Sequence, residues 1–160
     1  MLVFSHFRNG VGATSSHMNV NGLGAPIYFD YVAVDPIFWA ERVNIDISDG
    51  AILADGFGGR AALTNGLTLK YHDSDDSVLL DFLDGLVLKE NHEWSHLAGV
   101  DVDRDTQVGN TDDSLIVRWT IAKAGAPLKM VSGQYLRVTV QDDLSDLTHY
   151  EMNIQGVSRG

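Results

Sequence analysis

The sequence predicts an all-β protein: an antiparallel β-sandwich of the jelly-roll type with an extended N-terminal arm. Three observations predict this fold class. Apolar and polar residues alternate in several short segments. Residues that favour turns separate these segments at intervals of roughly 8–12 residues, which is typical of sandwiches. No segment combines a helical period with helix-capping residues at both ends.

The expected strands follow one another along residues 26–160, which we assign to the sandwich domain. Ile27–Val34 is rich in aromatic and β-branched residues, and Arg42–Ser48 alternates strictly. Leu67–His72 and Ser77–Leu83 flank the acidic turn 73–76 and predict a hairpin, although the second segment also fits a helical stripe. Later strands are expected at 114–119, 127–130, 135–140 and 150–155. The apolar faces of the expected strands include Val43, Ile45 and Ile47, Leu67, Leu69 and Tyr71, Leu136, Val138 and Val140, and Tyr150, Met152 and Ile154.

Residues 1–25 show no strand or helix period and contain several glycines. One interpretation is a loose terminus. However, Phe4, Phe7 and Met18 are apolar anchors that a disordered tail does not need. We therefore expect an arm that becomes ordered on a neighbouring subunit, with these three residues at the interface.

The composition restricts the function. The chain has 160 residues, 44% of them hydrophobic and 21% charged, as in an ordinary globular domain. The formal net charge of −11 and the scattered Lys and Arg residues argue against direct nucleic-acid binding. There is no apolar run of about 18 residues to cross a membrane. The start does not resemble a signal peptide, and the lack of cysteine excludes disulfides and thiolate metal sites.

Residues 92–96 spell the zinc-protease string HExxH. In that string His92 and His96 would bind zinc and Glu93 would act as the base, provided that the segment is helical. Gly99 extends the match to the longer zincin string, but the third ligand position of that string holds Val102, which cannot bind a metal. We expect a polar loop here, with a small zinc metalloprotease as the alternative.

The segment 101–112 alternates oxygen donors, beginning with Asp101, Asp103 and Asp105, as calcium loops do. An EF-hand needs glycine at the sixth position and glutamate at the twelfth, where this chain has Thr106 and Asp112. We expect an acidic solvated loop, with a calcium site of another type as the alternative. No cofactor is expected.

Three stretches resemble small structural proteins of tailed bacteriophages: FGGRAALTNG at 57–66, RWTIAKAG at 118–125, and QDDLSDLT at 141–148 followed by Gln155-Gly156. The resemblance covers most of residues 40–157. It implies a β-sandwich that decorates the capsid or lies at the neck or tail, and it implies no catalytic residue.

Together these observations predict a non-enzymatic virion structural protein, made in the host cytoplasm. Its expected partners are major capsid or neck and tail proteins and further copies of itself in a symmetric homo-oligomer. The alternatives are the zinc metalloprotease and a carbohydrate-binding sandwich, which would need exposed aromatic side chains near calcium ligands.

Overall fold

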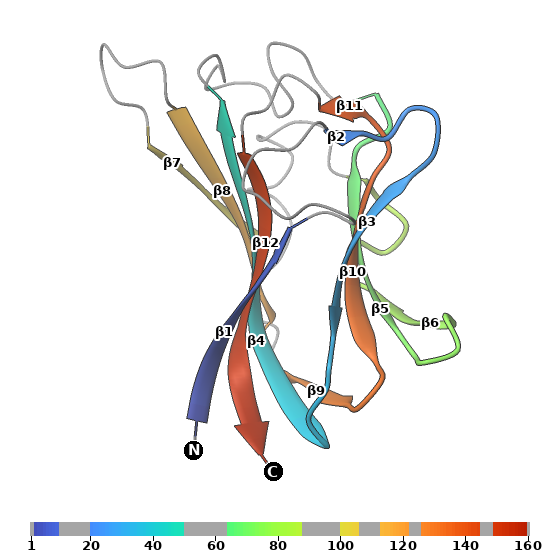
Figure 1. Ribbon diagram of the computed structural model, residues 1–160, viewed down its shortest axis with the longest axis vertical. Coiled ribbons are helices and arrows are strands. Elements are labelled where there is room, and N and C mark those ends of the chain that lie inside the picture. Colours follow the sequence, from blue (N-terminus) through green and yellow to red (C-terminus); the bar gives the residue numbers. More distant parts are fainter. Residues whose placement is uncertain are drawn as a thin grey trace.

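Two antiparallel sheets face each other in the computed structural model, which describes residues 2–9, 20–49, 64–87, 100–105, 113–121, 126–144 and 149–159 (Figure 1). These residues form strands and turns and contain no α-helix, which confirms the all-β sandwich. None of them forms a helix long and apolar enough to span a membrane. The strands are β1 (Leu2–Asn9), β2 (Val20–Asn21), β3 (Ile27–Val32), β4 (Ile37–Asp49), β5 (Leu67–His72), β6 (Val78–Asp81), β7 (Val100–Asp105), β8 (Asp113–Thr120), β9 (Leu128–Val131), β10 (Tyr135–Val140), β11 (Asp143–Leu144) and β12 (His149–Arg159).

The larger sheet has the order β1-β12-β4-β8-β7 and is built around the long strand β4. β12 pairs with β4 along nearly its whole length. On its other edge, β4 pairs with β9 near its start and with β8 from Arg42 onwards. β4 is 13 residues long, so one of its edges has room for two strands.

The smaller sheet has the order β3-β10-β5-β6. β10 lies at its centre and pairs in register with β3 on one side and β5 on the other. β5 and β6 form the predicted hairpin, and the turn between them contains Asp76 with a φ of 72°. The short pair β2–β11 lies near one end of this sheet (Figure 1).

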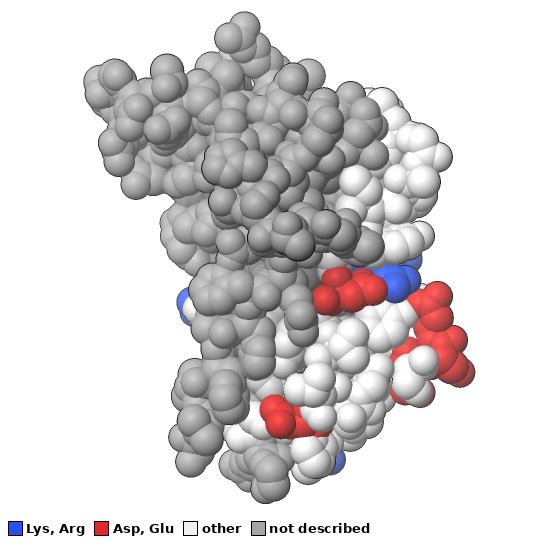
Figure 2. Space-filling model, viewed as in Figure 1, with Lys and Arg blue, Asp and Glu red and all other residues white. Residues whose placement is uncertain are grey.

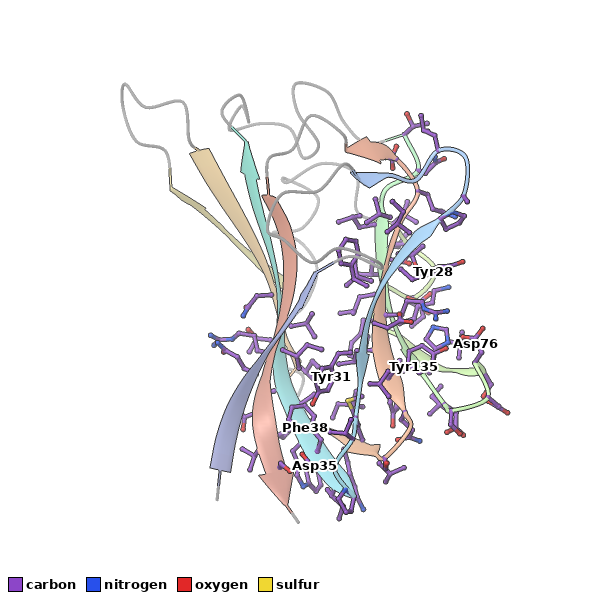
Figure 3. The ribbon with its side chains drawn as sticks, viewed as in Figure 1. Tyr28, Tyr31, Asp35, Phe38, Asp76 and Tyr135 are labelled. Carbon is purple, nitrogen blue, oxygen red and sulfur yellow. The ribbon has the colours of Figure 1, made fainter. Side chains whose placement is uncertain are left out.

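The core lies between the two sheets and follows the predicted alternation. Leu67, Leu69 and Tyr71 of β5 are buried, as are Leu136, Val138 and Val140 of β10. The larger sheet contributes Phe38, Ala40, Val43, Met130 and Ile154. Tyr31 and Phe38 meet between the layers with their ring centroids 5.2 Å apart (Figure 3). Burying side chains of this size contributes about 1.5–3 kcal/mol each.

A β-bulge interrupts the pairing of β12 with β4 between Gln155 and Gly156. A Cβ atom at Gly156 would lie 2.2 Å from the Trp39 carbonyl oxygen and 2.6 Å from the Phe38 ring. Glycine is therefore required here because the backbone of β4 approaches too closely for a side chain.

Two segments in which the sequence predicts no strand form strands, while the binding of residues 1–25 to a neighbouring subunit stays a prediction. Residues 2–9, expected in an arm, form β1, and Phe4 and Phe7 pair there with Gly156 and Asn153 of β12. β1 pairs with an edge of β12 that would otherwise present a row of unpaired backbone N–H and C=O groups. Residues 100–105 form β7 beside β8 instead of the expected loop.

Candidate functional site

Several of the predicted site residues lie outside the described part of the chain. His92, Glu93, His96 and Met18 fall outside it, so the zinc string and that anchor stay predictions. Asp101, Asp103 and Asp105 occupy alternate positions of β7. The structure describes only the backbone of these residues, so calcium binding stays a prediction. Within the described ranges, no group of three or more His, Asp or Glu residues is placed to hold a metal ion.

The structure instead gathers polar side chains on the outer face of the smaller sheet. Arg137 lies at the centre of this face on β10, with Asp30 of β3 and Lys70 of β5 in the positions beside it. The Arg137 guanidinium donates from Nε to Asp30 Oδ1 at 2.8 Å and from Nη2 to Asp30 Oδ2 at 2.7 Å. Two parallel bonds of this kind fix both side chains, because a planar guanidinium matches a carboxylate.

The turn between β5 and β6 is attached to the same group. Arg137 Nη1 donates to Asp76 Oδ1 at 3.0 Å, and the Tyr135 hydroxyl donates to the same carboxylate (Figure 3). The hydrogen bond from Tyr135 and the nearby Arg137 charge lower the pKa of Asp76. Burial, reinforced by the bond to Asp76, raises the pKa of Tyr135 to about 12. The turn is therefore held against the sheet by a carboxylate that stays charged and a phenol that stays protonated.

His72 completes the cluster from β5. Its ring stacks on Tyr135 with centroids 4.8 Å apart, and its Nδ1 lies 3.0 Å from the Asp76 carbonyl oxygen. Nδ1 therefore carries the proton, because a carbonyl can only accept. Nε2 is buried and has no hydrogen-bond partner in the part of the chain that the structure describes. The ring thus serves as packing for the turn.

This cluster is suited to rigidity rather than to catalysis. The guanidinium of Arg137 is paired with two carboxylates, and its carbon lies 4.3 Å from the centroid of Tyr28. Tyr28 is 37% exposed, but the guanidinium occupies part of its face, which leaves less of the ring for a sugar to stack on. Carbohydrate binding stays a prediction.

The hairpin beyond this cluster presents an unusual edge. Val78, Leu79 and Leu80 of β6 are 52%, 48% and 44% exposed. β6 pairs with β5, and no other described strand covers its second edge. Acidic side chains gather around the hairpin, at the right of Figure 2. They are Asp73, Asp75, Asp76, Asp81 and Asp84. Native proteins usually protect such an edge, so exposed apolar side chains along it make it a candidate binding surface.

A second constellation, around Asp142, joins the loops at the other end of the smaller sheet. The buried Asp142 carboxylate accepts hydrogen bonds from the backbone N–H groups of Thr64, Asn65 and Gly66 at 2.7–3.1 Å. Its backbone carbonyl accepts from Gly22 N at 2.8 Å. All of its acceptors face the protein's own backbone, so the role of Asp142 is structural.

A shallow pocket of about 170 Å³ lies beside the β-bulge of the larger sheet, lined by Glu41, Arg42, Thr120 and Gln155. Ligand pockets usually enclose about 300–1,000 Å³. The pocket is therefore small for a substrate site, although bulges often adjoin functional residues.

Sequence reasoning missed the contacts between distant residues. Asp30 and Arg137 are 107 positions apart, and only the pairing of β3 with β10 brings them together. The acidic run at 73–76 predicts a turn, but it does not by itself indicate a cluster with residues of other strands. In comparisons with known proteins, no family model, curated protein or solved structure matches the chain.

Proposed function

We propose that this protein is a non-enzymatic structural component of a tailed-phage particle that binds capsid or neck and tail subunits and further copies of itself. The observation that carries the proposal is the open edge of β6, where three exposed apolar side chains lie next to a hairpin held rigidly by Arg137, Asp76 and Tyr135. The resemblance of residues 57–66, 118–125 and 141–148 to virion proteins supports the same class.

The binding mechanism follows from the fold. A sandwich offers strand edges and loops, and an edge strand recognises a partner through backbone hydrogen bonds and alternate side chains. The rigid turn reduces the entropy that binding would otherwise cost. On a particle that repeats its subunits, many weak contacts act together and stabilise the assembly by mass action.

Co-sedimentation tests the proposal. An antibody raised against the purified protein is used to probe density-gradient fractions of a lysate in which this chain and phage particles are both produced. We expect the protein in the particle band, at a constant ratio to the major capsid protein across preparations. Recovery only in the soluble fractions, with intact particles in the same gradient, would contradict the proposal. Genes for portal and capsid proteins on either side of its own gene would support it independently.

A further inference from the structure

The second edge of β6, which no described strand covers, is also distinguished by its charge. The hairpin region carries Asp73, Asp75, Asp76, Asp81 and Asp84, and Lys70 is the lysine beside them, with its Nζ 3.6 Å from Asp81 Oδ2. Asp76 is compensated by Arg137, whereas Asp75 and Asp84 are exposed. The hydrogen bond from the Ser77 side chain, with that from its backbone N–H, lowers the pKa of Asp75, so its charge persists in mildly acidic solution.

Charge decides between two occupants of this edge. A second copy of the chain, paired edge to edge, would bring the same aspartates together across the contact. Like charges placed opposite each other on paired strands are destabilising. A net charge of −11 adds a general repulsion between copies. A strand flanked by lysine or arginine meets neither penalty, and its attraction to the aspartates would also speed its association.

The length of the edge limits its affinity. β6 has four residues, so an added strand gains few backbone hydrogen bonds. A stable isolated interface buries about 800 Å² on each partner, which a strand of this length does not provide alone. The contact therefore belongs to an assembly in which several such edges, or this edge with another surface, bind at once.

We infer that the open edge of β6 binds an extended, basic segment of another protein, which pairs as an additional strand of the smaller sheet. Apolar side chains of that segment pack against Leu79 and Leu80, and its flanking lysines or arginines face Asp75 and Asp84. This inference rests on the proposed function, since it names the chemistry of the partner in the particle.

Nuclear magnetic resonance titration of the full chain tests it with two defined peptides. Both have a Thr-Val-Val-Val-Thr centre, which places apolar side chains on both faces of an added strand. They differ in carrying two lysines or two glutamates at each end. We expect the lysine peptide to shift the amide signals of β6 and of the 73–77 turn. Its affinity should fall as the salt concentration rises, because salt screens the charges. Equal binding of both peptides, or binding of neither, would overturn the inference.

Matched variants separate the two contributions. Leu79→Ser with Leu80→Ser removes the apolar contact, and Val34→Ser is the control because Val34 is an apolar residue outside β6 that is 68% exposed. Asp75→Asn with Asp84→Asn removes charge while keeping shape, and Glu41→Gln beside the bulge removes charge elsewhere. We expect each edge variant to bind the lysine peptide about tenfold more weakly, the effect of losing about 1.4 kcal/mol, and each control to bind as the parent does.

Two further results bear on the occupant and on the proposed function. Sedimentation equilibrium showing a dimer that is lost in the Leu79→Ser, Leu80→Ser variant would assign the edge to a second copy and overturn the inference. Failure of peptide binding in a protein that still co-sediments with particles would reject the inference alone. Peptide binding by a protein absent from particles would support the edge chemistry and reject the virion role.

Discussion

Replacing Asp142 with alanine should destabilise the protein more than most substitutions of a polar residue. The Asp142 carboxylate accepts from three consecutive backbone N–H groups, those of Thr64, Asn65 and Gly66. Its position between β10 and β11 also ties this loop to the chain near Gly22. One side chain therefore organises segments that are more than 70 residues apart in sequence, since the separations from Thr64 and Gly66 are 78 and 76.

The size of the effect follows from the burial of each donor. Gly66 is buried, so its N–H would lose a charge-assisted bond and find no water, at a cost of about 1–3 kcal/mol. Thr64 and Asn65 are exposed, so water can replace the carboxylate and each loss costs about 1 kcal/mol. The sum is about 3–5 kcal/mol, a large part of the roughly 5–15 kcal/mol that stabilises a typical domain.

Urea denaturation followed by tryptophan fluorescence measures this loss. Asp142→Asn should be affected less than Asp142→Ala, since the amide oxygen can still accept from part of the loop. Gln141→Ala is the matched control, because Gln141 is the exposed neighbour and contributes its backbone carbonyl to Asn65. A free energy of unfolding for Asp142→Ala within about 0.5 kcal/mol of the parent would refute the reasoning, since surface changes stay within that range.

Four other outcomes are expected. Val138→Asp buries an unpaired charge at a fully buried position, so it should lower the free energy of unfolding by about 4 kcal/mol or more in the same urea assay. The control Thr139→Asp, on the outer face of β10, should lower it by less than about 1 kcal/mol. Burial raises the pKa of Tyr135 to about 12, so the native protein retains a proton that the unfolded chain releases near pH 10. This group should therefore leave the free energy of unfolding unchanged below pH 10 and lower it between pH 10 and 12. The Tyr135→Phe variant should lack that part of the decline. Deleting residues 1–9 removes β1 and uncovers β12, so the melting temperature should fall by more than about 4 °C; an unchanged melt would show that β1 adds nothing to the sandwich. Metal analysis of protein purified without chelator should find no stoichiometric zinc. One zinc per chain that is lost in His92→Ala would contradict the interpretation of residues 92–96 as a polar loop.

The strands of the core could be predicted because their signal is local. Alternation at Leu67, Leu69 and Tyr71 reports a half-buried strand whatever its partner, and these residues are buried as expected. Val100 and Val102 alternate with aspartates in the same way, which fits β7, but the acidity of this segment favours a loop. β1 has the weakest signal, because an edge strand is specified by the free edge of its neighbour as much as by its own residues.

The candidate surface could not be predicted because its contacts depend on topology. No spacing in the sequence relates Asp30 to Arg137, and their bidentate pairing exists only because β3 lies beside β10. The exposure of Leu79 and Leu80 is equally hidden, since apolar residues in a strand are expected to be buried. The helical interpretation of this segment, which the structure replaces with β6 and a turn, shows the same ambiguity of short apolar runs.

The pairing of β1 with β12 has a consequence for how this unit connects to anything joined to it. Leu2 lies opposite Ser158, so the two ends of the chain leave the sandwich at one corner (Figure 1). A unit whose ends are adjacent can be inserted into a surface loop of another protein without separating the two sides of that loop. The same arrangement allows a short linker to join the two ends and the chain to be opened at another position. A cut in the 73–77 turn would place the new termini beside β6 and leave the order of the strands in space unchanged.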